Sequence, residues 1–257
     1  MDPIAFNRTA WGRQVAKGNP WTVPVSAETV ARARSGDWSV VLTPELAVPR
    51  EWFGPLAGSR VLALASAGGQ QAPVLAAAGA NVTVFDLTPE QLDRDREVAG
   101  RDGLAIRTEE GDMRDLSRFA DGSFDVVFHP VANLFIPDVR PVWRECFRVL
   151  RYGGRLLAGF CNPVLFLVDE DESEGGEGDL VIRHRIPYSD LAVRSPERIE
   201  RMRADGDALT WGHTLDDQIG GQLAAGFVLR GFYEDGWPEQ RLAAYLKPFI
   251  ATLAVKP

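Results

Sequence analysis

Short apolar runs alternate with amphipathic segments from residue 60 onward. The runs whose length and composition predict strands lie at residues 60–65, 81–86, 105–109, 124–128 and 155–160. The segments with apolar positions at helical spacing lie at residues 70–78, 89–99 and 139–150. Strands that alternate with helices in this way are typical of a parallel sheet built from βαβ units.

Capping residues and turns place the ends of these elements. Thr88, followed by Pro89 and Gln91, predicts an N-cap with a capping box. The helix ends are predicted at the glycines that follow each pattern, Gly79, Gly100 and Gly153. Residues 227–233 and 249–255 predict two further strands, joined as an antiparallel pair at the sheet edge. We therefore expect an α/β fold with a seven-stranded, mostly parallel sheet, helices on both faces and an antiparallel last strand.

Two segments lie outside this rhythm. Residues 1–50 are rich in tryptophan and proline, which predicts short helices and turns that form an N-terminal lid. Residues 161–213 form an insertion after the fifth strand, which we expect to act as a second lid. The organisation expected is a lid at 1–50, a core at 51–160, the insertion at 161–213 and a helix with edge strands at 214–257 that completes the core.

Composition and charge exclude several classes of protein. A chain of 257 residues, 45% hydrophobic and 25% charged, can bury a large core. The net charge of −8 and the lack of any basic cluster exclude a nucleic-acid partner. No apolar run approaches the roughly 18 residues that span a bilayer, and no leader pattern is present, so we expect a cytoplasmic location without membrane insertion.

Cysteine, histidine and acid positions argue against a metal centre. Cys146 and Cys161 match no ligand spacing and are expected to be buried thiols. The three histidines are widely separated, so we expect no metal ligand among them. Seven acids crowd residues 169–179, a charge block that is typical of a solvated loop.

Candidate chemistry follows the predicted strands, because ligands of open parallel sheets bind at the carboxyl ends of the strands. The turn at residues 65–69 has small side chains that let a ligand approach backbone N–H groups. Asp86 ends the second strand, where adenosine-binding sheets hold ribose hydroxyls. Asp112 follows the third strand and can accept from an exocyclic amine, with Met113 against a flat ring.

In this order and spacing the residues resemble the class I S-adenosylmethionine-dependent methyltransferases, and within them the group of ubiquinone and menaquinone biosynthesis enzymes. The matching pieces lie at residues 61–69, 86–88, 111–113, 124–127, 148–156, 212–215 and 225–227. The resemblance covers about two-thirds of the chain. It implies a Rossmann-like fold, S-adenosyl-L-methionine as cofactor and a small-molecule methyl acceptor, in a monomer or homodimer.

The resemblance also implies site residues. The turn at 65–69 would face the methionine end of the cofactor, Asp86 would bind the ribose, Asp112 and Met113 would hold the adenine, and His129 with its two successors would lie beside the cofactor. The complete implied cofactor set is Ala65, Ser66, Ala67, Gly69, Gln70, Asp86, Leu87, Gln91, Gly111, Asp112, Met113, His129, Pro130 and Val131.

The first motif departs from the family pattern. An acid and two glycines of the family's acid-x-Gly-x-Gly-x-Gly are replaced here by Ala63, Ala65 and Ala67. The acid that contacts the methionine amino group is therefore missing. Gln70, or a residue of the N-terminal segment such as Asn7 or Trp11, is expected to compensate.

Methyl transfer from a sulfonium is an in-line displacement, which needs alignment, exclusion of water and, for a protic acceptor, a base. His129 is the candidate base, with His213 and the more remote Tyr188 as further candidates. Trp11 and Trp21 are candidates for lining an apolar acceptor pocket.

The sequence leaves two other functions open. A nicotinamide-dependent oxidoreductase would also use Asp86 on an adenine ribose, but the turn lacks G-x-G-x-x-G and no Tyr-x-x-x-Lys pair is present. A regulatory protein that binds S-adenosylmethionine without catalysis would be consistent with the altered first motif.

Overall fold

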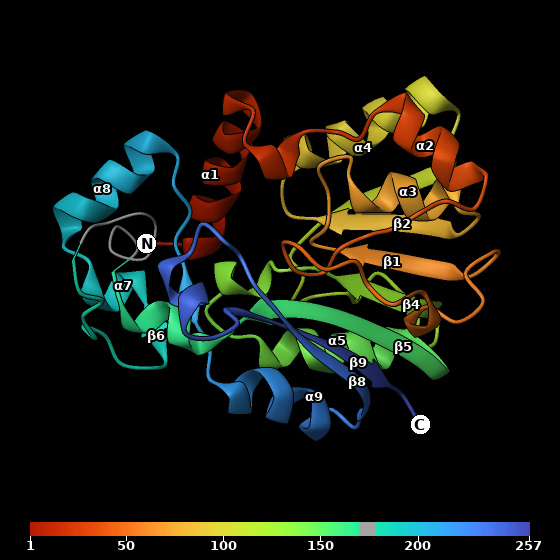
Figure 1. Ribbon diagram of the computed structural model, residues 1–257. Coiled ribbons are helices and arrows are strands. Elements are labelled where there is room, and N and C mark those ends of the chain that lie inside the picture. Colours follow the sequence, from red (N-terminus) through yellow and green to blue (C-terminus); the bar gives the residue numbers. More distant parts are fainter. Residues whose placement is uncertain (170–177) are drawn as a thin grey trace.

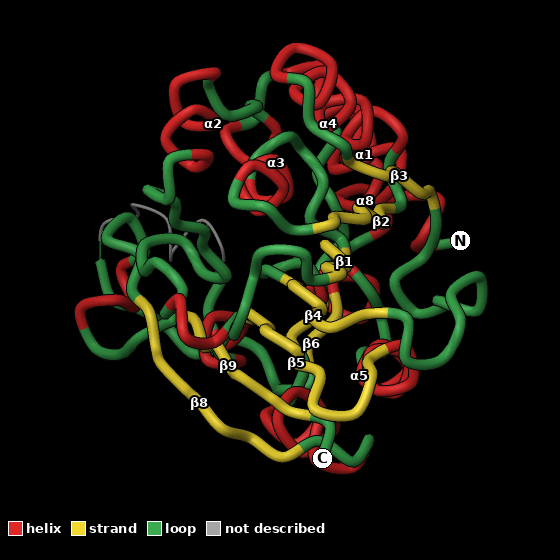
Figure 2. The backbone as a smooth tube through the Cα atoms, turned by 90° about the vertical axis from the view of Figure 1, so that its right-hand side faces the viewer, coloured by secondary structure: helices red, strands yellow, loops and turns green. Residues whose placement is uncertain are grey.

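The computed structural model describes residues 1–169 and 178–257 and shows one large sheet with helices on both faces (Figures 1 and 2). The strands of this sheet, in its spatial order, are β3 (Ile106–Glu110), β2 (Asn81–Asp86), β1 (Arg60–Leu64), β4 (Phe124–His129), β5 (Leu150–Cys161), β9 (Phe249–Val255) and β8 (Val228–Asp235). All neighbouring pairs are parallel except those of β9, which runs antiparallel to both β5 and β8. The expected seven-stranded sheet is confirmed, with β8 at the edge and β9 inserted beside it.

Successive side chains of the central strands pack alternately into two separate hydrophobic cores, one on each face of the sheet. Val61 and Ala63 of β1 face the side covered by three helices, α2 (Ala27–Arg34), α3 (Gln71–Ala77) and α4 (Pro89–Asp102). The intervening residues Leu62 and Leu64 face α5 (Arg140–Val149), on the opposite side. A strand covered on both faces has no polar side, which is why the sequence of β1 is apolar throughout.

The remaining elements gather at one end of the sheet or close its edge. They are α1 (Pro3–Lys17), η1 (Pro20–Thr22), η2 (Arg50–Trp52), η3 (Asn133–Phe135), η4 (Pro163–Leu167), β6 (Tyr188–Ser189), α7 (Asp190–Val193), α8 (Pro196–Asp205), β7 (Trp211–Gly212), the π-helical η5 (Asp216–Gly220), α9 (Gly221–Ala224) and η6 (Arg241–Ala244). Figure 1 shows α7, α8 and β6 beyond the ends of the strands, with α1 between them and α4. Strands β6 and β7 form a separate two-stranded sheet.

One local expectation is partly right and two are wrong. Thr88 occupies the N-cap position of α4 and is followed by the predicted proline, but its hydroxyl makes no capping bond and is hydrogen-bonded to the Asp86 carboxylate. Helix α4 continues past Gly100 to Gly103, whose φ of 61° provides the left-handed cap. Helix α5 ends at Val149, and Gly153 lies inside β5 at a register shift between β4 and β5.

The structure shows the surroundings of two features noted in the sequence, the cysteines and the acidic block. Cys146 and Cys161 are buried free thiols, as expected, and burial raises the pKa of Cys161 to about 12. Asp169, at the start of the acidic block, is ion-paired with Arg183 and Arg194 rather than solvated alone. Residues 170–177 of that block lie outside the described part of the chain. No helix in the described ranges has the length and apolar character needed to cross a membrane.

Candidate functional site: a cavity at the carboxyl ends of the strands

A cavity of about 900 Å³ opens at the carboxyl ends of β1 to β5. The predicted site residues that line it are Ala65, Ser66, Ala67, Gln70, Asp86, Leu87, Gln91, Gly111, Asp112, Met113, Pro130 and Val131. Two predicted residues, Gly69 and His129, do not line it. The opposite wall comes from α1, η4, β6 and α8, so the cavity lies between the sheet and the segments that stand outside its strand rhythm.

The turn after β1 is strained and tightly held. Ala65 has a φ of 46° and is the only non-glycine residue with positive φ in the described ranges. The Gly68 N–H donates to Asp95 Oδ2 at 3.0 Å, and the Val25 N–H donates to the Gly69 carbonyl at 2.8 Å. Gly69 is therefore part of the packing under the N-terminal segment, which explains its absence from the cavity wall.

Neighbouring segments approach the backbone so closely around this turn that glycine is required. A Cβ on Gly68 would lie 2.9 Å from the Trp21 carbonyl oxygen and 3.0 Å from Gln91 Oε1. A Cβ on Gly111, at the end of β3, would lie 2.3 Å from the Phe85 ring. Both glycines let the backbone come close to the walls of the cavity.

Asp86 is oriented by backbone groups at the end of β2. Its Oδ1 accepts from the Thr88 N–H at 3.0 Å and its Oδ2 accepts from the Ala67 N–H at 3.3 Å. Desolvation raises the pKa of Asp86 to about 6, and the hydrogen bonds from Thr88 and Ala67 limit that rise. The carboxylate keeps free lone pairs, and it lines the cavity.

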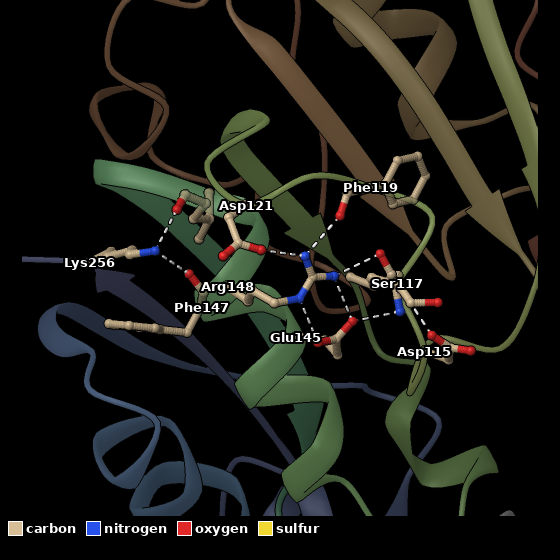
Figure 3. Close-up of polar contacts among 10 residues, drawn as sticks. Asp115, Ser117, Phe119, Asp121, Glu145, Phe147, Arg148 and Lys256 are labelled. Atoms are coloured by element: carbon tan, nitrogen blue, oxygen red, sulfur yellow. Dashed lines mark hydrogen bonds and ion pairs between the residues drawn. The ribbon is translucent and has the colours of Figure 1, made fainter.

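Asp112 and Met113 begin the loop between β3 and β4 and line the cavity beside Gly111. The Asp112 carboxylate accepts from both Nε and Nη2 of Arg114, which holds it in place. Farther along this loop, Arg148 of α5 donates to the carbonyl oxygens of Leu116 and Phe119 (Figure 3). The loop that carries Asp112 is thus anchored to α5.

His129 is placed differently from the prediction. Side chains alternate along β4, and the His129 ring packs edge-on against Trp143 of α5, with ring centroids 5.9 Å apart. It is fully buried, and its Nδ1 is 2.9 Å from the Leu64 carbonyl oxygen. Desolvation lowers the pKa of His129 to about 4. A base for an acceptor in the cavity would need to reach that cavity, so the geometry does not support His129 in this role.

The other two candidate bases differ in whether they line the cavity. His213 is buried, outside the cavity wall, with its Nε2 3.0 Å from the Asn133 carbonyl oxygen, and desolvation lowers its pKa. Tyr188 does line the cavity, and its hydroxyl donates to Asp190 Oδ1 at 2.7 Å. Burial and the Asp190 carboxylate raise the pKa of Tyr188, which keeps its hydroxyl protonated near neutral pH and so unable to take a proton from an acceptor.

Two of the three residues expected to replace the missing acid are occupied elsewhere. The Gln70 amide donates to the carbonyl oxygens of Pro20 and Val23, and so ties the N-terminal segment over the turn. Asn7 donates to the carbonyl oxygens of Phe135 and Leu209 and accepts from the Leu209 N–H. Of the three, only Trp11 lines the cavity without a polar bond of this kind, with its ring edge-on to Phe135.

Two buried acceptors at the cavity wall lack donors. Ser66 Oγ and Gln91 Oε1 are both buried, and neither has a hydrogen-bond partner among the described residues. Both atoms have almost no accessible surface, so they lie behind the wall rather than open to the cavity. The carboxylates of Asp86 and Asp112 do line the cavity, and they suit a ligand that donates hydrogen bonds, as S-adenosylmethionine does through its ribose and adenine.

Sequence reasoning missed a second group of polar residues, on the wall formed by the insertion. The Asp190 carboxylate accepts from the Tyr188 hydroxyl and from both N–H and hydroxyl of Thr210. Arg194, Arg198 and Asp207 line the same wall. No sequence motif marks these residues, because the insertion lacks the alternation of apolar runs and amphipathic segments that located the strands. Asp95, which holds the glycine turn, could have been found from its spacing of one helical turn after Gln91.

The sequence is similar to proteins described as methyltransferases. A family profile described as a methyltransferase domain matches residues 62–158. An uncharacterized methyltransferase of Bacillus subtilis (strain 168), YbaJ, is 48% identical over 255 residues, which are 98% of each chain. A ubiquinone biosynthesis O-methyltransferase of Xanthomonas euvesicatoria is 33% identical over 107 residues, which are 42% of this chain and 45% of that one.

Solved structures share the fold. An S-adenosylmethionine-dependent methyltransferase from Mesorhizobium loti superposes with a TM-score of 0.59 at 20% identity, over 80% of this chain and 94% of that one. A geranyl diphosphate C-methyltransferase from Streptomyces coelicolor A3(2) superposes with a TM-score of 0.52 at 14% identity, over 80% and 76% of the two chains. At these identities the likeness concerns the fold alone.

Proposed function

The chain belongs to the class I S-adenosylmethionine-dependent methyltransferases, and from this membership we propose that it methylates a small-molecule acceptor bound in the cavity, by in-line displacement. The observation that carries the proposal is the shared wall of the cavity. Residues 65–67 of the turn after β1, Asp86 after β2 and Asp112 after β3 all open into one space. Its volume of about 900 Å³ lies toward the upper end of ligand pockets, which run to roughly 1,000 Å³.

We assign the cofactor to the sheet side of the cavity. Asp86 would accept hydrogen bonds from the ribose hydroxyls, since its carboxylate is oriented by Thr88 and Ala67. Asp112 would accept from the adenine amine, with Met113 against the ring. The bound cofactor supplies an electrophilic methyl group on a positively charged sulfur.

The acceptor would lie against the insertion side of the cavity. Residues 161–168, from η4 and its flanks, and residues 188–210, from β6 to the segment between α8 and β7, provide this wall. Trp21 of the N-terminal segment meets Trp237 of the β8–β9 connection edge to face, at 6.3 Å between ring centroids. We assign residues 1–50, 161–169 and 178–213 to the lid that orients the acceptor and excludes water; residues 170–177 of the predicted insertion lie outside the described part of the chain.

None of the three candidate bases is suited to removing a proton from the acceptor. The raised pKa of Tyr188 argues against it, and His129 and His213 are buried away from the cavity wall. Alignment of the acceptor and exclusion of water therefore provide most of the catalysis that we assign to this chain.

Calorimetric titration with S-adenosylhomocysteine tests the cofactor assignment. We expect a single site per chain, with affinity at least tenfold weaker in the Asp86→Asn variant. Asp93→Asn, an exposed substitution on α4, is the matched control and should bind as the wild type does. Absence of binding by the wild-type chain, or equal binding by Asp86→Asn, would contradict the assignment. Methyl transfer itself is tested with radiolabelled S-adenosylmethionine and a broad acceptor panel.

A further inference from the structure

Arg198 is a cation of the cavity wall that has no counter-charge among the residues that the structure describes. It lies in the first turn of α8, is half-buried and lines the cavity. Its backbone N–H donates to Ser195 Oγ, but its guanidinium makes no hydrogen bond or ion pair within the described ranges. A half-buried guanidinium offers five N–H donors in a planar fork that matches a carboxylate.

The neighbouring charges are already balanced. The Asp190 carboxylate accepts a hydrogen bond from Arg194 Nε at 3.3 Å, in addition to those from Tyr188 and Thr210. Arg194 also donates to Asp169, which binds Arg183 as well. Each of the two carboxylates is already bonded to at least one guanidinium, and neither forms a hydrogen bond or ion pair with Arg198.

Asp207 is the other charged side chain on this wall that pairs with no residue in the described part of the chain. It lies beyond the far end of α8, where the Gln14 amide donates to the adjacent Gly206 carbonyl. Gly206, whose left-handed conformation ends α8, precedes it, whereas Arg198 lies in the first turn of that helix. No ion pair joins the Asp207 carboxylate to the Arg198 guanidinium among the described residues, so the wall has a cationic end and an anionic end.

Apolar side chains line the same wall as Arg198. Phe166 and Tyr188 pack with ring centroids 5.4 Å apart and planes inclined by 32°. Met202, one turn after Arg198 on the same face of α8, also lines the cavity. A ligand here would meet apolar surface next to the Arg198 cation.

We propose that the methyl acceptor is an apolar molecule with one carboxylate, and that Arg198 binds this carboxylate while the apolar body packs against Phe166 and Met202. The inference rests on the proposed function, since it names the class of acceptor for the same cavity. Charge-assisted bidentate pairs of this kind are among the strongest hydrogen bonds in proteins. Arg198 is therefore a residue that determines acceptor specificity.

Binding of matched ligands tests the proposal without depending on turnover. Protein saturated with S-adenosylhomocysteine is titrated with phenylacetate, hydrocinnamate and decanoate, each beside its primary amide and its amine. We expect the acid to bind at least tenfold tighter than the amide for one or more of these skeletons. Arg198→Gln should abolish this preference and Arg198→Lys should restore part of it. Arg201→Gln, an exposed change on the same helix, should leave it intact.

The outcomes separate this proposal from the proposed function. Binding of S-adenosylhomocysteine without any preference for acid over amide would overturn the carboxylate assignment alone. The same conclusion follows if the preference survives in Arg198→Gln, or if amines bind best and lose this advantage in Asp207→Asn. Failure of S-adenosylhomocysteine to bind at all would instead overturn the proposed function.

Discussion

The imidazole of His129 donates from Nδ1 to the carbonyl oxygen of Leu64, across the neighbouring strands β1 and β4. A carbonyl oxygen can only accept, so this bond assigns the proton of the neutral ring to Nδ1. Nε2 is buried and has no partner among the described residues. Protonation would place an unpaired charge in the core, which is why the pKa of His129 falls to about 4.

A His129→Gln variant should therefore lose less stability in acid than the wild type does. The unfolded histidine titrates near 6.5 and the folded one near 4, so the wild-type free energy of unfolding falls as the pH drops between these values. We expect the difference in the free energy of unfolding between the two proteins to change by about 3 kcal/mol between pH 7 and pH 4. Urea denaturation at several pH values measures it. His213 remains in both proteins, so its own titration cancels. Parallel pH profiles would contradict this account of the buried ring.

Ala65→Gly should stabilise the protein. Ala65 adopts a φ of 46°, a left-handed conformation that costs a residue with a Cβ about 1 kcal/mol or more. Glycine removes this strain but loses more chain entropy on folding, so we expect a net gain in the free energy of unfolding of up to about 1 kcal/mol. Ala67→Gly, in the same turn without a positive φ, is the control and should destabilise. A loss of stability in Ala65→Gly would show that the turn is not strained.

Asp95→Asn should also stabilise the protein, in a pH-dependent way. Asp95 Oδ2 accepts from the Gly68 N–H, Oδ1 has no partner among the described residues, and desolvation raises the pKa of Asp95 to about 7. Asparagine keeps the acceptor and removes the buried charge. Because the folded pKa is raised, the advantage should grow as the pH rises from about 4 to 7 and then stay constant, at on the order of 4 kcal/mol.

Thermal unfolding of the Asp95→Asn variant across this pH range measures the effect. Asp93, on the exposed face of the same helix, pairs with Arg96, and Asp93→Asn should shift the midpoint little at any pH. An Asp95→Asn advantage that is equally large at pH 4 and pH 8 would exclude titration as its origin.

Arg148→Lys should destabilise the protein although it conserves charge. All five N–H groups of Arg148 are used, on the carbonyl oxygens of Leu116 and Phe119 and on the carboxylates of Asp121 and Glu145 (Figure 3). Lysine has three donors on one atom and cannot reach all of these acceptors. We expect a loss of about 3 kcal/mol in the free energy of unfolding, measured by urea denaturation. Arg144→Lys, at an exposed position of the same helix, should be neutral, and equal effects of the two changes would contradict the role of the network.

The sequence predicted most of the sheet, since its signals are local. Apolar runs separated by segments with a period of about 3.6 located the strands, and the acids directly after two of these strands, Asp86 and Asp112, do share one cavity wall. The helix ends at Gly100 and Gly153 were wrong, because a glycine permits a helix to end without requiring it. Other ends, such as that of β9, matched residue by residue.

The site was predicted less completely. His129 was expected beside the cofactor because it ends a strand, yet the alternation of side chains along β4 turns its ring toward α5. The hydrogen bonds of Gln70 and Asn7 join segments 47 to 202 residues apart, and no local pattern records such pairings. Arg198 and Asp190 come from an insertion without strand rhythm, whose path over the cavity is set by packing.

By itself the sequence determined the order of strands and helices, the acids at the strand ends and the family to which the chain belongs. These properties depend on hydrophobic periodicity and on residues a few positions apart, where the backbone geometry is nearly fixed. Only the tertiary structure decided which side chains face the cavity and which are consumed in packing. That choice depends on hydrogen bonds and burial between distant segments, and it separates the buried ring of His129 from the guanidinium of Arg198 on the cavity wall.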